Sequence, residues 1–197
     1  MTAVTLDAVP AAPSERPRVL LYGAAFAAGA STLAVLALVA TYLRHRADVL
    51  GAGELLFPEG TVLPLTPGTM NLVTLGMSLV TASWIVWALR NQDRVHAYLA
   101  LGLTGLLGVA SIVETFYLYQ QTSMPVRSGV GVLFYAVTGG HMAMSVLGLL
   151  FLAVMGLQAF GGQLTGRDAE GMSAAILYWY ATVGVYVVVW YAVYITK

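Results

Sequence analysis

Residues 130–160 read VGVLFYAVTGGHMAMSVLGLLFLAVMGLQAF, a continuous apolar stretch that contains one histidine and no charged side chain. A transmembrane α-helix needs about 20 consecutive, mostly apolar residues. This stretch exceeds that length, and it lacks the alternation of polar and apolar residues that marks membrane β-barrel strands. It therefore predicts a helix that crosses a bilayer.

Similar stretches occupy residues 19–43, 69–89, 96–119 and 172–195, so that the chain contains five in all. Every charged residue except Glu114 lies between or beyond them. The composition agrees, because 59% of residues are hydrophobic and 9% are charged, against about 25% charged in an average soluble domain. We expect an all-α integral membrane bundle of five transmembrane helices as a single domain over residues 19–197. Residues 1–18 lack the apolar core of a cleavable signal and are read as a mobile N-terminal tail.

The charge balance and the cysteine count exclude several classes of function. Nine Lys and Arg residues balance nine Asp and Glu residues, which gives no basic surface for nucleic acid. There are no cysteines, so disulfides, thiolate metal sites and cysteine nucleophiles are excluded.

The connectors after the first are short, which favours antiparallel neighbours. Lys and Arg divide five against four between the two sides, which favours a cytoplasmic N-terminus and an external C-terminus.

Small and polar residues recur at helical spacing in four of the segments and predict faces that contact other helices. These stripes are Gly23, Ala27, Ala30 and Ala34; Thr104, Gly108, Ser111 and Glu114; Thr138, His141, Ser145 and Gly148; and Ser173, Tyr180, Gly184 and Tyr191. The last segment is also rich in Tyr and Trp. We expect its aromatic residues at mid-depth to pack against another protein.

Glu114 and His141 are the candidate functional residues, because each lies well inside a membrane-length segment. A central charged side chain costs roughly 2.5–3.5 kcal/mol on insertion scales, so such residues are retained for a purpose or neutralised by a partner. Counting 1.5 Å per residue puts the two at depths that differ by about 9 Å, which does not favour a direct ion pair. Glu114 is predicted to act as a proton relay, a lipid contact or an inter-subunit hydrogen bond, or else only to hold two helices together.

Other kinds of site find less support in the sequence. His45 and His96 lie at opposite membrane edges, so His141 has no second histidine at its depth to share a haem. One carboxylate and one imidazole do not complete a metal coordination shell. Ser111 and Ser145 have no hydrolase motif around them. Together with Thr138 and Tyr180 they remain weaker candidates for a polar site between helices.

Several motifs resemble those of cytochrome c oxidase subunit III, in the same order along the chain. They are the run from Phe134 to His141 with Gly148 after it, the proline-bearing stretch from Pro58 to Asn71, the basic turn from Arg90 to Arg94, Glu114 with Phe116-Tyr117, and Tyr178-Trp179. The resemblance covers about residues 40–197. It departs from the family pattern at Met144, Tyr180 and Val183, and at Ala30-Ser31, where the family has an acid. Five helices rather than seven resemble the short bacterial members.

The resemblance implies a non-catalytic accessory subunit of a respiratory oxidase in a bacterial plasma membrane. Such a subunit binds the haem-copper subunit I and subunit II, supports proton uptake, and holds phospholipid, while haem and copper belong to the partners. Two alternatives remain: an accessory protein of nitric-oxide reductase, and a small proton-coupled transporter that uses Glu114.

Overall fold

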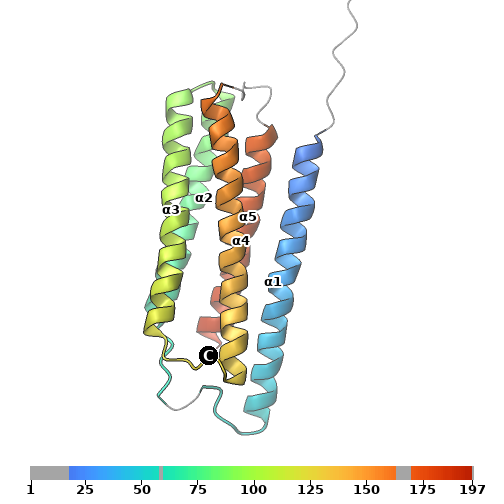
Figure 1. The fold of residues 1–197 in the computed structure, drawn as a ribbon, viewed down its shortest axis with the longest axis vertical. Coiled ribbons are helices and arrows are strands. Elements are labelled where there is room, and N and C mark those ends of the chain that lie inside the picture. The colour runs from blue at the N-terminus through green and yellow to red at the C-terminus, as the bar shows by residue number, and fades with distance from the viewer. Residues whose placement is uncertain (1–17, 58–59, 163–169, 197) are drawn as a thin grey trace, which may run out of the picture.

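The computed structural model describes residues 18–57, 60–162 and 170–196, and these residues form a helical bundle without β-strands (Figure 1). The helices are α1 (Val19–Gly51), α2 (Leu65–Arg90), α3 (Arg94–Gln121), α4 (Gly129–Phe160) and α5 (Glu170–Trp190). A turn of π-helix, Tyr191–Ile195, continues α5. All five are long and apolar enough to cross a membrane, which confirms the predicted fold class. Apart from Arg18, the predicted N-terminal tail lies outside the described residues.

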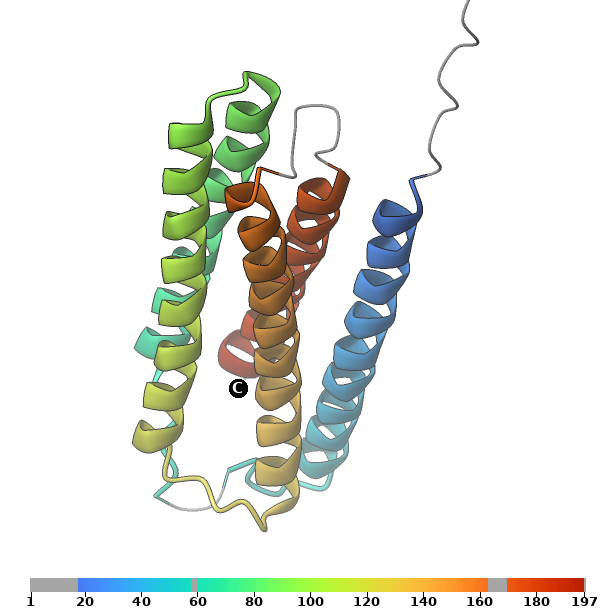
Figure 2. The same ribbon diagram turned by 45° about the horizontal axis from the view of Figure 1, so that its top comes forward.

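The helices form three groups, which both ribbon views separate (Figures 1 and 2). Helices α2 and α3 pack tightly on each other, and α1 packs on α4 and α5. The α4–α5 pair lies between α1 and the α2–α3 hairpin. Helix α5 is the centre of the bundle. In its apolar, membrane-length part 61% of the residues are buried, against 22% in the corresponding part of α1. Helix α1 is therefore the peripheral helix.

The helix ends differ from the predicted ones most clearly in α1. This helix continues past the predicted end at residue 43 to Gly51, through a charged stretch in which Arg44 Nε lies 3.4 Å from Asp48 Oδ2. Charged side chains one turn apart do not end a helix once it has left the membrane. Helix α2 begins at Leu65 and tolerates Pro67, because the first turn needs no amide donor at that position.

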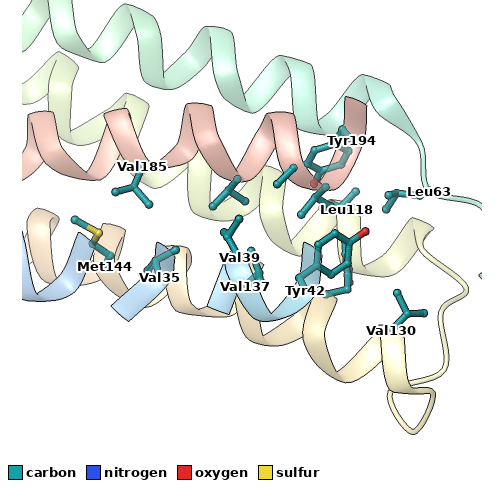
Figure 3. Close-up of a cluster of buried hydrophobic side chains, with 14 of the residues drawn as sticks. Val35, Val39, Tyr42, Leu63, Leu118, Val130, Val137, Met144, Val185 and Tyr194 are labelled. Carbon is teal, nitrogen blue, oxygen red and sulfur yellow. The ribbon is translucent and has the colours of Figure 1, made fainter. Parts of the chain in front are cut away.

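Two apolar cores meet at α5. One is built from α1, α4 and α5 with Leu118 of α3, and Figure 3 shows Val35, Val39 and Val137 pointing into it. The other joins α2 to α5 and contains the fully buried Trp179. The Trp179 ring fits between α3 and α4 because both helices carry glycine there. A Cβ atom at Gly108 or Gly148 would lie 2.8 or 2.9 Å from the ring.

Two of the four predicted helix-contact stripes lie mainly on outward faces, although Tyr180 bonds to Ser83 of α2 at 2.7 Å. Gly23, Ala27, Ala30 and Ala34 are exposed along α1, and Tyr180, Gly184 and Tyr191 are exposed along α5. The predicted role of the mid-depth aromatics is wrong for Trp179 and Tyr186, because both are buried inside this chain. In a membrane helix the outward face is apolar too, so small residues alone do not distinguish it from the inward face.

Candidate polar site within the membrane

Glu114 lies on the side of α3 that faces α2. Its Oε1 atom accepts a hydrogen bond of 3.0 Å from Thr74 Oγ1. Its Oε2 atom is buried and has no hydrogen-bond partner among the described residues. One half of the carboxyl group thus joins two helices, and the other half faces the interior of the bundle.

His141 lies on α4, and only 2% of its surface is exposed. Its Nε2 atom is 3.1 Å from the carbonyl oxygen of Thr182 on α5. A carbonyl oxygen only accepts, so Nε2 carries the hydrogen, and Nδ1 of the neutral ring keeps its lone pair. The ring lies 4.8 Å from that of Tyr186. The side chain is therefore held in one orientation by α5.

Glu114 and His141 line the same small pocket, although they do not form an ion pair. The ion pairs among the described residues are Arg44–Asp48 and Asp93–His96. The pocket has a volume of about 10 Å³ and lies between α2, α3, α4 and the end of α5. Its lining comprises Pro67, Gly68, Asn71, Glu114, Thr115, Leu118, Thr138, His141, Tyr186 and Tyr194. The two candidates therefore border one cavity on different helices.

The weaker candidates divide between the pocket and other places. Thr138 lines the pocket, and its hydroxyl lies 2.8 Å from that of Tyr119. Ser145 is buried and donates to the carbonyl oxygen of His141 at 3.1 Å. Ser111 is buried on α3, where its carbonyl oxygen accepts a hydrogen bond from Thr115 Oγ1 at 2.9 Å.

Tyr180 does not belong to the pocket. The residue is 39% exposed, and its hydroxyl lies 2.7 Å from Ser83 Oγ on α2. This contact ties α5 to α2 at the surface of the bundle. The structure therefore separates Tyr180 from Glu114 and His141.

Comparison with known proteins identifies the family. The sequence profile described as cytochrome c oxidase subunit III matches residues 31–197, which include most of α1 and all of the other helices. The chain belongs to the cytochrome c oxidase subunit III family. It is thus a multi-pass membrane protein of this family, as the motifs around Glu114 and His141 predicted.

Relatives named cytochrome c oxidase subunit 3 show how far the similarity extends. The chain is 29% identical to that of Oryctolagus cuniculus and 30% identical to that of Formosania lacustris. Both alignments cover 142 residues, 70% of this chain and 54% of the relative. This subunit III-family chain therefore spans about half the length of the curated relatives that it matches.

Sequence reasoning missed four polar residues of the pocket, one each on α2, α3, α5 and the π-helical turn. Asn71, Thr115, Tyr186 and Tyr194 all line it, and none was singled out as a site residue. Leu75 and Ser78 follow Asn71 after four and seven residues, so the three lie on one face of α2, and all are buried. A polar stripe on the second segment could have indicated this face, as it did for the third and fourth segments.

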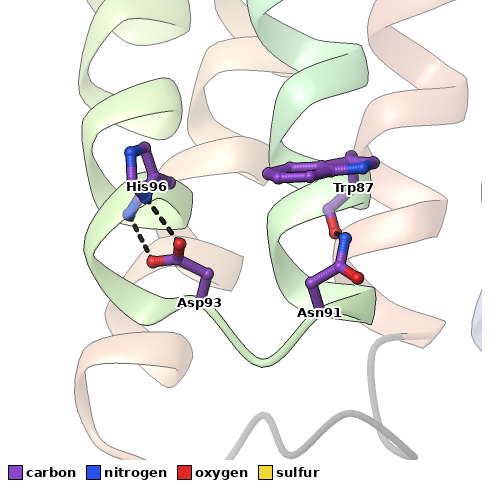
Figure 4. Close-up of polar contacts among 4 residues, drawn as sticks. All are labelled: Trp87, Asn91, Asp93 and His96. Atoms are coloured by element: carbon purple, nitrogen blue, oxygen red, sulfur yellow. Dashed lines mark hydrogen bonds and ion pairs between the residues drawn. The ribbon is translucent and has the colours of Figure 1, made fainter.

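The described residues contain no group of three or more His, Cys, Asp and Glu side chains placed to hold a metal ion. The histidine–carboxylate pair that does form lies at the opposite end of the bundle (Figure 4). Asp93 caps α3, where its Oδ1 accepts from the His96 backbone amide at 3.1 Å and its Oδ2 lies 2.6 Å from His96 Nδ1. The hydrogen bond from that amide, aided by the His96 ring, lowers the pKa of Asp93 below its ordinary value of 3.8.

Proposed function

We propose that this chain is a non-catalytic accessory subunit, subunit III, of a respiratory cytochrome c oxidase in a bacterial plasma membrane. It would bind beside the catalytic haem-copper subunit I and subunit II, which would hold the haem and copper. The observation that carries the proposal is the family match over residues 31–197. The relatives named above are subunits 3 of cytochrome c oxidase, which supports an oxidase over a nitric-oxide reductase as the partner.

The organisation of the polar groups supports a structural role for this chain. Buried side chains make hydrogen bonds from one helix to the next, as Trp179 Nε1 does with Ser78 Oγ at 2.9 Å and Tyr186 with the Gly68 carbonyl oxygen at 2.9 Å. Such bonds hold helices together in a medium without water. They make a stable bundle that can support a neighbouring subunit.

Purification of the tagged chain in mild detergent tests the assignment. We expect haem-containing large subunits to co-purify, and mass spectrometry to identify them as subunits I and II of an oxidase. A large subunit of nitric-oxide reductase in their place would establish the alternative partner. A colourless, monodisperse monomer with an activity of its own would contradict both.

Glu114 is the residue through which this subunit would support proton uptake. Its carboxyl group is the one acidic group described within the five apolar segments that the sequence predicts, and the residue lines a polar pocket. We expect Glu114→Gln to leave assembly intact and to slow proton uptake, or to shorten the lifetime of the complex during turnover, by about twofold to fivefold, an effect of roughly 0.4–1 kcal/mol.

Thr74→Val is the matched control for Glu114→Gln, because it removes the hydrogen bond to Oε1 and keeps the carboxyl group. If the carboxyl proton matters, only Glu114→Gln changes the pH profile. An unchanged pH profile and lifetime in Glu114→Gln would leave this residue with a role in holding α2 to α3 and no more.

A groove between α3 and α4 gives the proposed phospholipid a place. It has a volume of about 500 Å³, and its walls are apolar throughout. Its lining comprises Leu101, Gly105, Val109, Ile112, Val146, Leu149, Leu150, Leu152, Ala153, Gly156, Leu157 and Phe160. In a bilayer the hydrocarbon chain of a lipid is the group that matches such a surface, since it loses no hydrogen bonds there.

A further inference from the structure

Two buried oxygen atoms without partners lie at the pocket that Glu114 and His141 share. They are Asn71 Oδ1 on α2 and Glu114 Oε2 on α3, and neither has a hydrogen-bond partner among the described residues. Only 3% of the Asn71 surface is exposed. Buried polar atoms in folded proteins are nearly all hydrogen-bonded, to protein or to ordered water. Two such atoms at one cavity therefore point to a ligand.

The orientation of the Asn71 amide follows from its neighbour. Its Nδ2 atom lies 3.2 Å from Thr115 Oγ1, and that hydroxyl donates its only hydrogen to the Ser111 carbonyl oxygen at 2.9 Å. The hydroxyl can therefore only accept from Asn71, so the amide nitrogen must face Thr115. The amide oxygen is consequently directed away from Thr115 and needs a donor.

Three other polar side chains of the pocket, those of Tyr186, His141 and Thr138, do not supply that donor. The Tyr186 hydroxyl donates to the Gly68 carbonyl oxygen, and His141 Nε2 is engaged with the Thr182 carbonyl oxygen. Thr138 Oγ1 donates to the Phe134 carbonyl oxygen at 2.8 Å. The hydrogen bonds of these side chains are thus already formed with the backbone.

We propose that the pocket is a hydration site for one water molecule that bridges Asn71 Oδ1 and Glu114 Oε2. A volume of about 10 Å³ is close to the roughly 10–15 Å³ that one water needs by this measure. Water fits either state of the carboxyl group. It donates to both oxygens when Glu114 is ionised, and it accepts from Oε2–H and donates to Asn71 when Glu114 is protonated.

The pocket lies near one end of the bundle. Pro67 and Gly68 belong to the first turn of α2, and Tyr194 belongs to the C-terminal π-helical turn. Asn71 is six residues from the start of α2, which corresponds to about 9 Å along the helix axis. The bound water therefore lies near the bundle end that carries the α1–α2 and α3–α4 connectors.

A high-resolution structure of the purified native complex tests the site directly. We expect one density peak within hydrogen-bonding distance of both Asn71 Oδ1 and Glu114 Oε2, and no peak in Asn71→Leu. Infrared difference spectra of the same samples in H₂¹⁶O and H₂¹⁸O should contain a bound-water band that Asn71→Leu abolishes. Ser78→Ala is the matched control, because Ser78 is a buried polar residue of α2 outside the pocket.

Several outcomes would overturn the proposal. They are an empty pocket at a resolution where other buried waters are visible, a peak with the coordination of a metal cation, and a water band that persists in Asn71→Leu. Thr115→Val provides a second variant should Asn71→Leu fail to fold, because it frees the amide to rotate and should shift the band. None of these readouts depends on oxidase activity, so the hydration site stands or falls separately from the proposed function.

Discussion

The same two helices, α3 and α4, line a polar pocket towards one end of the bundle and an apolar groove towards the other. At the pocket, Glu114 and His141 reach hydrogen-bond partners on α2 and α5. At the groove, the small residues Gly105 and Ala153 line an open space of about 500 Å³. In lipid the hydrophobic effect does not drive helices together. Polar side chains join the helices at the pocket, whereas apolar side chains alone line the groove.

The largest effect is expected from closing the pocket with a side chain. A Cβ atom at Gly68 would lie 2.6–2.9 Å from three atoms of the buried Tyr194 ring. We expect Gly68→Val to destabilise the bundle by about 1–3 kcal/mol, as overpacking does in other cores. Thermal unfolding of the purified protein in detergent measures this. Gly76→Val on the same helix is the control, because nothing lies within 4 Å of its Cβ position, and equal losses in both would refute the explanation.

A smaller effect is expected from removing one hydrogen bond at the pocket. Thr74→Val deletes the donor to Glu114 Oε1, and we expect a loss of about 0.6 kcal/mol, the average for hydrogen bonds between membrane helices. Thr41→Val is the control, since that exposed hydroxyl bonds only to its own helix at Ala37. Denaturant titration of both variants measures the difference. No excess loss in Thr74→Val would mean that the Thr74–Glu114 bond does not stabilise the pocket end.

A substitution in the groove lining should change the number of bound lipids more than the stability of the protein. Gly105→Phe places a ring in the groove, where nothing lies within 4 Å of the Cβ position. We expect about one fewer phospholipid per chain by native mass spectrometry, with a change in stability below about 0.5 kcal/mol. Gly102→Phe adds the same ring to an exposed position outside the groove. Unchanged lipid content in Gly105→Phe would remove the groove as a lipid site.

The smallest effect is expected at the α2–α3 turn, whose residues line neither the pocket nor the groove. The pKa of Asp93 is lowered by its bonds to His96, so its contribution to stability is complete above pH 3.8 and is lost as the pH falls through the lowered value. Asp93→Asn keeps a capping side chain and should abolish this pH dependence. Hydrogen exchange of the His96 and Ala97 amides between pH 2 and pH 6 measures it. The same acid response in the variant would assign it to another group.

The fold was predictable because segment length and hydropathy suffice to identify membrane helices. The inward faces of α3 and α4 were also predictable. Ser111, Thr138, His141 and Ser145 are polar among apolar residues, and all four are buried. The inward faces of α1 and α5 were not predictable in this way. In α1, valine and alanine suit lipid and protein equally, so the sequence offers no contrast. In α5, tyrosine occurs on both faces, since Tyr186 is buried and Tyr180 is exposed.

The pocket itself required three-dimensional information. Its lining comes from four helices and the π-helical turn, and the offset between α3 and α4 depends on helix ends that sequence locates only to within a few residues. Counting along the helices separated Glu114 from His141. The cavity that joins them depends on Asn71 and Tyr186, which approach from the other two helices.

The central position of α5 has a consequence for biogenesis. Ser31 of α1 reaches the Tyr178 hydroxyl at 3.1 Å across 147 residues of sequence, and α1 makes its main contacts with α4 and α5. Synthesis runs from the N-terminus, so α1 leaves the ribosome well before these partners exist. It must stay in the lipid, or with an insertion factor, until α5 has been inserted. The helix made last in this bundle thus determines when the first one is folded.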